Sequence, residues 1–572
     1  MEKCVKKVDK YFERLDQLSD YFSEFFWGLV RNLFDYATSE EEGSLIVSIG
    51  KIVEAEERAD AKALELWKSD VANEGLDEET DGPSPKAFKS KFFETVAEII
   101  QDRFQLWLEQ FDDDIFNSLD ATSFVFDDLD CVANYVVPRL PKSWNIMTFI
   151  TSEYHQQLNN IVTQIATLDL DAGQILHLLR WARDYYGDMK KQRGVTEKQL
   201  EPKLLEEQED TLIKDYLALV RTKVDEWMAN LTRTIQQEFA ERVNPPEQDA
   251  EDKYGMSVAV IVFQVINQQV DLATEANRGQ LLCDVVEQCT GSLKMTQEQW
   301  RQLIKFEVDA QLTGEDVPGG IVEYLMAFAN EQLRCVEFCD AIVERLSGML
   351  SNKYSMLVGK SFDEALAGFL DTANVASQHL IDIAFNDMMS VYTTLFSSEW
   401  YGGEHIVLVI ETLRDYCQDF QSAMKGFLFS RLMQNIVERH LVEYISAMQN
   451  PDVVFKMPSC KHRLKGDMEQ VMMFFGEFIE DEQQIKEAFD PLQRLIGFLT
   501  ASSDNLYLEF HNLRKRYPEF SVGFAEKVLS KREDLEAEKL NEVMETIHSK
   551  MTEAGVEMKG RNEGPSVFAK LK

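Results

Sequence analysis

Apolar residues recur along most of this sequence at the spacing of one face of an α-helix. The clearest stripe advances by alternate steps of four and three residues through Ile406, Ile410, Leu413, Cys417, Phe420, Met424 and Phe427. It continues in a shifted register to Ile436, which predicts one long helix with a gentle bend at Gly426. Similar stripes at 93–111 and 325–346 predict further helices. The sequence therefore predicts an all-α fold built from long helices.

Signals for β-strands are weak by comparison. The best candidate is the β-branched stretch 257–266, which runs into a Gln-rich segment that suits a helix. We therefore predict a buried helix there. No repeat of fixed period is visible, so tetratricopeptide or ankyrin arrays are not supported.

Proline and glycine divide the chain into three predicted regions. Pro245 and Pro246 stop any helix, which separates an N-terminal helical bundle region at 1–245 from a middle bundle at 246–400. A C-terminal bundle follows at 401–572. The Gly- and Pro-marked acidic segment at about 70–86 predicts a mobile loop, and the tail from Asn562 onward predicts a frayed end. Near the end, Ser521 is expected to cap a helix.

The charge balance limits which partners this chain can bind. Asp and Glu number 100 against 59 Lys and Arg, a formal net charge of −41. Such a surface repels nucleic acid and anionic membranes except where basic residues cluster. No apolar run approaches the roughly 18 residues of a membrane span, and no signal peptide is visible. We therefore expect a cytoplasmic protein.

One local cluster runs against the acidic background. The candidate docking residues for an acidic protein or an anionic lipid are Arg514, Lys515, Arg516, Lys527, Lys531 and Arg532. A second cluster lies at 456–465, and the tail adds Lys570 and other basic residues. A solvated or internally paired face explains the same residues, and that alternative stays open.

Motifs for catalysis, metals and nucleotides are weak. Leu357–Ser361 resembles the end of a phosphate-binding loop, but Tyr354 occupies the position of the first glycine. We predict instead a helix boundary at Gly359 with Ser361 as the N-cap. Cys283, Cys289, Cys335 and Cys339 could suggest zinc, yet they lie among apolar residues and fit buried packing thiols better. We therefore predict a protein without catalytic residues, cofactor or metal.

Several strings, in a consistent order along nearly the whole chain, resemble one known family. They are Phe26-Trp-Gly-Leu, Pro138-Arg-Leu-Pro-Lys-Ser-Trp, Asn244-Pro-Pro-Glu, Ala329-Asn-Glu-Gln-Leu-Arg-Cys and Leu395-Phe-Ser-Ser-Glu-Trp-Tyr. Together they resemble the Sec-six-type subunit of the exocyst (the exocyst complex component three family), especially its fungal forms.

The resemblance implies an elongated rod of consecutive helical bundles, like subunits of multisubunit tethering complexes. It also implies a non-catalytic exocyst subunit that helps tether secretory vesicles to the plasma membrane before SNARE-mediated fusion. The implied partners are other exocyst subunits, plasma-membrane SNAREs and their regulators, with peripheral contact to anionic membrane. The implied location is the cytoplasm, with recruitment to sites of polarised secretion. The resemblance also implies an upstream coiled coil that pairs with another exocyst subunit, and we expect this sequence to begin after most of it.

Two other classes of protein fit the helical pattern. An α-helical scaffold or adaptor of another transport complex would show short, regularly repeated helix pairs. An enzyme acting on lipids or nucleotides would show a deep pocket with converging, perturbed ionisable groups.

Overall fold

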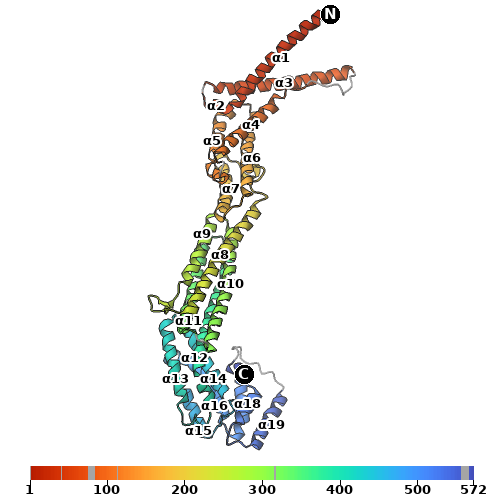
Figure 1. Cartoon of the computed structure of the whole chain (residues 1–572). Coiled ribbons are helices and arrows are strands. Elements are labelled where there is room, and N and C mark those ends of the chain that lie inside the picture. Colours follow the sequence, from red (N-terminus) through yellow and green to blue (C-terminus); the bar gives the residue numbers. More distant parts are fainter. Residues whose placement is uncertain are drawn as a thin grey trace. The chain divides into compact units, whose positions relative to one another are not determined.

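The computed structural model describes the backbone of every residue except 1, 40, 75–83, 112–113, 315–316, 555–565 and 572, and it leaves the side chains of 2–9, 11, 70–74 and 551–554 undescribed. In the described residues the chain forms nineteen α-helices and one small β-hairpin (Figure 1). The predicted all-α architecture of helical bundles is therefore confirmed. None of the described helices is long and apolar enough to cross a membrane.

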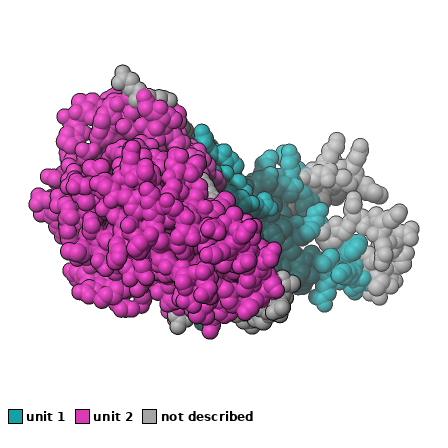
Figure 2. Space-filling model, turned by 90° about the horizontal axis from the view of Figure 1, so that it is seen from below, with its two compact units in different colours: residues 1–219 teal, residues 220–572 magenta. Residues whose placement is uncertain are grey.

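Two compact units make up the chain, residues 1–219 and residues 220–572 (Figure 2). The three regions expected from the sequence stay a prediction. Unit 1 contains α1 (Glu2–Arg31), α2 (Leu33–Ala37), α3 (Gly43–Glu74), α4 (Phe88–Leu108), α5 (Phe124–Cys131), α6 (Ile146–Ala166) and α7 (Ala172–Arg193). Helix α8 (Glu209–Glu241) supplies residues to both units.

Aromatic side chains and buried polar bonds form the core of unit 1. Phe104 in α4 packs edge-on against Tyr154 in α6, with their ring centroids 5.7 Å apart. The Tyr154 hydroxyl donates to Asp128 in α5 at 2.7 Å, and Arg103 from α4 donates to both oxygens of the same carboxylate. His155 is buried between the Tyr185 hydroxyl (3.1 Å) and the Pro202 carbonyl oxygen (2.7 Å). These bonds join α4, α5, α6 and α7 because each buried polar group finds a partner on another element.

The segment that carries the predicted acidic loop lies mostly outside the described residues. At its described end, the backbone N–H groups of Lys86 and Ala87 donate to the carboxylate of Asp60 in α3, at 3.1 and 2.9 Å. Helix α4 begins directly after this contact.

Unit 2 starts within α8, and the hairpin and a series of helices follow. Its elements are β1 (Glu247–Gln248), β2 (Tyr254–Gly255), α9 (Val258–Glu275), α10 (Gly279–Leu312), α11 (Ile321–Ser347), α12 (Asn352–Thr394), α13 (His405–Ala423), α14 (Gly426–Ala447), α15 (Ser459–Phe475), α16 (Glu482–Leu499), α17 (Leu506–Arg516), α18 (Val522–Leu529), α19 (Ala537–Ala554) and the short 3-10 turn η8 (Val567–Lys570). Helix α9 confirms the buried helix predicted at 257–266. The Phe524 N–H donates to the Ser521 hydroxyl at 3.0 Å, which confirms the predicted cap.

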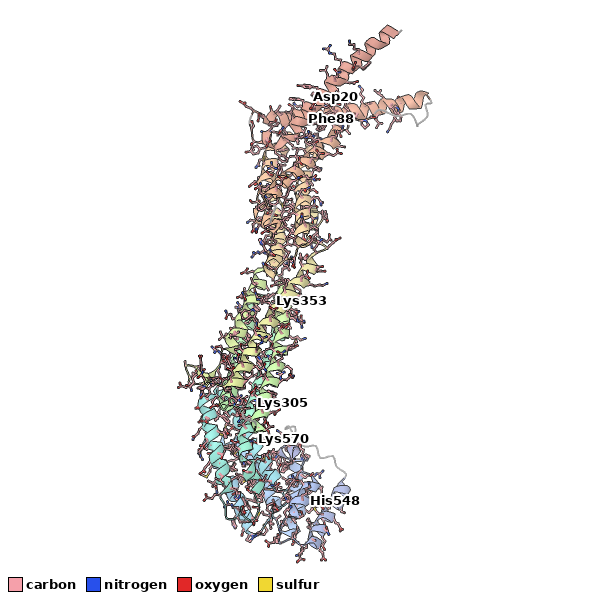
Figure 3. The ribbon with its side chains drawn as sticks, viewed as in Figure 1. Asp20, Phe88, Lys305, Lys353, His548 and Lys570 are labelled. Atoms are coloured by element: carbon pink, nitrogen blue, oxygen red, sulfur yellow. The ribbon has the colours of Figure 1, made fainter. Side chains whose placement is uncertain are left out.

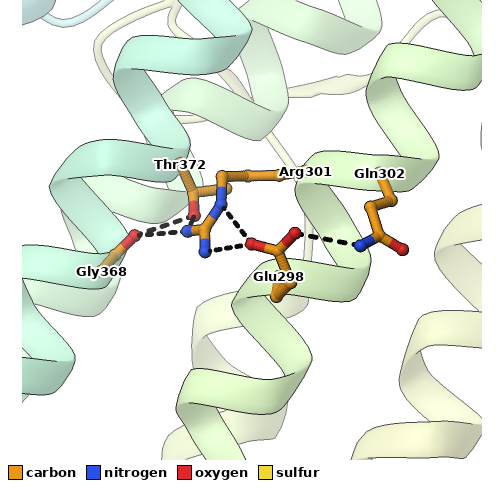
Figure 4. A network of polar contacts seen from close by, with 5 residues as sticks. All are labelled: Glu298, Arg301, Gln302, Gly368 and Thr372. Atoms are coloured by element: carbon orange, nitrogen blue, oxygen red, sulfur yellow. Dashed lines mark hydrogen bonds and ion pairs between the residues drawn. The ribbon is translucent and has the colours of Figure 1, made fainter.

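Helices α10 and α12 approach closely at a glycine. A Cβ at Gly368 would lie 2.0 Å from the Gln297 amide oxygen, so a larger residue would displace the Gln297 side chain. The Gln297 amide donates to the Ala365 carbonyl at 2.8 Å. Arg301 adds a bond to the Thr372 hydroxyl at 3.0 Å and is itself held by Glu298 (Figure 4). Hydrogen bonds from Arg301 lower the pKa of Glu298, so this surface pair is charged near neutral pH.

The single helix predicted through residues 406–436 is wrong at one place. The chain leaves the helix at Met424 and Lys425, whose backbones are extended, and α14 starts at Gly426. Asn330 of α11 explains the break: its amide donates to the Ala423 carbonyl at 2.9 Å, and its oxygen accepts the Lys425 N–H at 2.9 Å. These bonds replace the intrahelical ones lost at the break.

The same part of α11 also fastens the hairpin. The Asn330 amide donates to the Tyr254 carbonyl at 2.8 Å, and the Glu331 carboxylate accepts the Ala259 N–H at 2.8 Å. From the hairpin, the Lys253 ammonium donates to the carbonyls of Gln421 and Ser422 at the end of α13. The hairpin, α11 and the α13–α14 break therefore form one hydrogen-bonded junction, here called the α11 junction.

The phosphate-loop candidate lies inside a helix. Helix α12 runs unbroken through Gly359 and Ser361, so the predicted helix boundary and N-cap are wrong. The Ser361 hydroxyl donates instead to the Leu357 carbonyl one turn earlier. A helical backbone leaves no glycine loop to surround a phosphate.

The cysteines pack as apolar side chains. Cys283, Cys289, Cys335 and Cys339 are all buried free thiols, as predicted. Burial raises the pKa of Cys289 to about 12, which keeps this thiol protonated and a poor metal ligand at neutral pH. In the described part of the chain, no three His, Cys, Asp or Glu side chains are arranged to hold a metal ion.

Candidate docking surfaces

The structure places the six basic candidates in different surroundings. Arg532 is not a surface residue, because its side chain is only 4% exposed. Its guanidinium donates to the carbonyls of Leu499 and Ala501 at 3.1 and 2.7 Å, and to both carboxylate oxygens of Asp534. Arg532 therefore holds the end of α16 against the segment after α18, and its inclusion among the docking residues is wrong.

The first group of cations, Arg514, Lys515 and Arg516, lies in the last turn of α17. Arg516 is half-buried, with its Nε 3.9 Å from a carboxylate oxygen of Asp490 in α16. Burial alone would raise the pKa of Asp490, but hydrogen bonds from Arg494 and Tyr517 outweigh it, and this pKa is lowered. Arg514 is partly exposed and Lys515 is exposed. Lys515 is thus the most accessible cation of this group.

The second group lies beside the turn that follows α14. Lys527 is exposed, and its ammonium reaches the Gln449 side-chain oxygen at 3.5 Å. Lys531 donates to the Pro451 carbonyl at 3.1 Å. Arg516 thus contacts α16, whereas Lys527 and Lys531 contact the turn after α14.

One member of the cluster predicted at 456–465 is paired internally. Arg463 donates to the Gly403 carbonyl and lies over the Trp400 ring, 5.8 Å from its centre. It also approaches Asp467, a carboxylate that is 1% exposed and accepts hydrogen bonds from the Trp400 indole (2.9 Å) and the Tyr444 hydroxyl (3.0 Å). These contacts support the internally paired interpretation for Arg463. The other basic residues of the cluster are exposed: Lys456, Lys461, His462 and Lys465.

An exposed apolar face on α1 was not recognised from the sequence. Helix α1 packs on α4 only through its last turns, where Phe26 and Trp27 contact Phe88 with ring centroids 5.4 and 5.2 Å apart (Figure 3). Earlier on the helix, six large apolar side chains are 44% to 72% exposed: Phe12, Leu15, Leu18, Tyr21, Phe22 and Phe25. Leu15, Leu18, Phe22 and Phe25 follow steps of three, four and three, which is the spacing of a coiled-coil seam. This spacing could have revealed the apolar face from the sequence alone.

The second missed feature is the tail segment, residues Ser566–Leu571. Val567 and Phe568 are buried, at 8% and 5% exposed, in a part of the chain predicted to be frayed. The frayed end therefore does not include this segment, while residues 555–565 and 572 lie outside the described residues. The apolar Val-Phe-Ala run in the sequence could have indicated that this segment packs against the rest of unit 2.

Comparison with known proteins identifies the family. A family model described as "Exocyst complex component Sec6" matches residues 12–537. This chain belongs to the Sec6 family of exocyst components. It is 27% identical to exocyst complex component sec6 of Schizosaccharomyces pombe, over 99% of this chain and 75% of that protein. It is 26% identical to SEC6 of Saccharomyces cerevisiae, over 78% of this chain and 62% of that protein.

Two crystal structures share the Sec6-family fold. The C-terminal domain of the exocyst subunit Sec6p aligns with 64% of this chain and 97% of that domain, at TM-score 0.57 and 24% identity. M-Sec aligns with 98% of this chain and 91% of that one, at TM-score 0.62 and 16% identity. The matching proteins named above are exocyst components or share the fold, and none is described as an enzyme. The family membership decides against an adaptor of an unrelated transport complex.

Proposed function

We propose that this Sec6-family chain is a non-catalytic exocyst subunit that helps tether secretory vesicles to the plasma membrane, and that the exposed face of α1 binds another exocyst subunit. The family match supports the first part. The observation that carries the second is the apolar seam at residues 15–25, whose four side chains at coiled-coil spacing are 44% to 61% exposed. Large exposed apolar patches mark interaction sites. The three-four spacing fits an amphipathic helix, which inserts its own side chains between those of α1.

Removing this seam should separate the chain from the complex. The double variant Leu18→Glu/Phe25→Glu places charges where the partner helix would pack, so recovery of exocyst subunits with the tagged chain should fall at least tenfold. The measurement is affinity isolation from a fungal lysate with quantitative mass spectrometry. The matched control is Asp16→Asn/Asp20→Asn on the opposite side of α1, which should keep full recovery. Equal recovery with both variants would refute the role of α1.

We also propose that the exposed lysines of α17 and α18 bind acidic surfaces of plasma-membrane SNARE proteins or their regulators. Lys515 and Lys527 are exposed cations on a chain of net charge −41, so they offer local attraction against a repulsive background. This contact would place a cytoplasmic subunit at sites of polarised secretion. Anionic lipid is the alternative ligand for the same charges.

Charge reversal distinguishes these ligands. Lys515→Glu/Lys527→Glu should weaken binding to purified plasma-membrane SNAREs at least tenfold, as read by biolayer interferometry at low salt. The control is Lys305→Glu/Lys353→Glu, which reverses exposed lysines on α10 and α12 with the same total change in charge. A loss of binding confined to phosphatidylserine vesicles would assign the lysines to lipid. Unchanged binding to SNAREs and vesicles would contradict both assignments.

A further inference from the structure

The tail segment lies in a groove that it does not fill. We name as the tail groove the surface formed by Tyr517, Glu519, Phe520, Phe524 and Lys527, with Glu438 and Gln449 across it. Two adjoining hollows of about 830 and 420 Å³ share Gln449 and Lys527 in their walls. Lys570 lines the larger hollow, and Phe568, Ala569 and Leu571 line the smaller one.

The tail segment is held in this groove by its side chains. Phe568 meets Phe520 and Tyr517 with ring centroids 5.1 and 5.5 Å apart. Phe520 in turn packs on Phe498 and Phe510, so the Phe568 ring extends an aromatic cluster of the unit 2 core. Aromatic pairs at these distances attract each other beyond the effect of burial alone.

Polar contacts fix the direction of the segment. The Ser566 hydroxyl donates to Glu519 at 3.0 Å, and the Lys570 ammonium lies 2.5 Å from a Glu438 carboxylate oxygen in α14 (Figure 3). Within the segment, the Ala569 N–H donates to the Ser566 carbonyl. No backbone bond between the described tail and the groove is present, so recognition depends on an apolar pair, a hydroxyl and a cation.

We propose that the tail groove is a binding site for a short peptide of a partner protein, and that residues 566–571 occupy it in cis as a competitor. The occupant expected in trans carries an aromatic residue after an aliphatic one and a lysine or arginine two positions later. The aromatic cluster selects the ring, and Glu438 selects the cation. Burying two apolar side chains is opposed by the entropy of ordering the segment, and these terms are similar in size. A partner peptide meets the same entropy and must also bind from solution, so it displaces the tail through further contacts in the hollows that the tail leaves unfilled.

The test uses the full chain and a fluorescein-labelled synthetic peptide of residues 564–572. Phe568→Ala/Lys570→Glu removes the anchors of the cis segment, so this variant should bind the peptide at least tenfold more tightly than the wild type. Fluorescence anisotropy gives both affinities, and circular dichroism confirms that the fold is kept. If the double variant loses its fold, Lys570→Glu alone provides the same comparison.

A charge exchange tests the predicted chemistry of the occupant. Adding Glu438→Lys to Phe568→Ala/Lys570→Ala, whose tail carries no charge to pair with the new lysine, should weaken binding of the natural peptide at least tenfold and restore binding of a peptide with Lys570 replaced by Glu. The matched control is Glu411→Lys, an exposed acid on α13, which should change neither affinity. Equal binding of wild type and double variant, or undiminished binding of a peptide with Phe568 replaced by Ala, would overturn the proposal. Dimerisation of the wild-type chain that the double variant abolishes would assign the groove to a second copy and overturn the partner assignment.

Discussion

Replacing Asp467 by alanine is expected to lower the free energy of unfolding of unit 2 by about 3–5 kcal/mol. The substitution leaves two buried donors, the Trp400 indole N–H and the Tyr444 hydroxyl, without their acceptor. It also removes the carboxylate that faces Arg463. Urea denaturation gives the energy, and hydrogen exchange should show faster exchange at residues 396–403 and 440–448. An effect below about 1 kcal/mol would mean that these donors find other partners or reach water.

The isosteric variant Asp467→Asn separates hydrogen bonding from charge. One amide oxygen can still accept from Trp400 and Tyr444, so the cost at neutral pH should be about 1 kcal/mol. Burial raises the pKa of Asp467 above its ordinary value, despite lowering effects from Trp400 and Tyr444. The folded state therefore binds this proton more tightly than the unfolded state, and stability from this group is lost as pH rises through its folded pKa. Relative to Asp467→Asn, the wild type should gain stability as pH falls from 7 toward 4.

Local patterns in the sequence were enough to predict several helices and one cap. The apolar spacing predicted α4 and α11, and the apolar stretch before a Gln-rich segment predicted α9. The position of Ser521 after Pro518 predicted the cap of α18. The break between α13 and α14 could not be found this way. It depends on Asn330, which lies 95 residues before Lys425 in the sequence. The shifted register indicated a bend at Gly426, but periodicity does not show a hydrogen bond to so distant a residue, so the full break was missed.

The candidate surfaces show the same limit. Arg532 belonged to a group of basic residues in the sequence. Only the fold shows that its guanidinium donates to the carbonyls of Leu499 and Ala501. Phe568 stood among tail residues with Gly564 and Pro565 before it, and its burial depends on Tyr517 and Phe520. The seam of α1 was readable from its spacing, but spacing alone does not tell a covered face from an open one. The sequence shows where basic or apolar residues are clustered along the chain, but their exposure to solvent depends on the tertiary fold.

Replacing Asn330 by alanine is expected to lower the free energy of unfolding of unit 2 by about 2–4 kcal/mol and to release the α11 junction locally. The change removes the partner of the Tyr254 and Ala423 carbonyls and of the Lys425 N–H. Hydrogen exchange at 247–255 and 421–427 should therefore accelerate at least tenfold. The control is Gln332→Met in the same helix: the Gln332 amide atoms are buried without a hydrogen-bond partner in the described structure, so methionine should be tolerated.

Asn330→Asp decides which of the three bonds matters. Aspartate can still accept the Lys425 N–H, but it places a carboxylate oxygen against the Tyr254 and Ala423 carbonyls, where the asparagine amide donates. We therefore expect this variant to be at least as unstable as the alanine variant. A mild effect would show that the Lys425 bond alone holds the α13–α14 break. Because the two carbonyls belong to the hairpin and to α13, a severe effect would instead show that one amide couples these elements to α11.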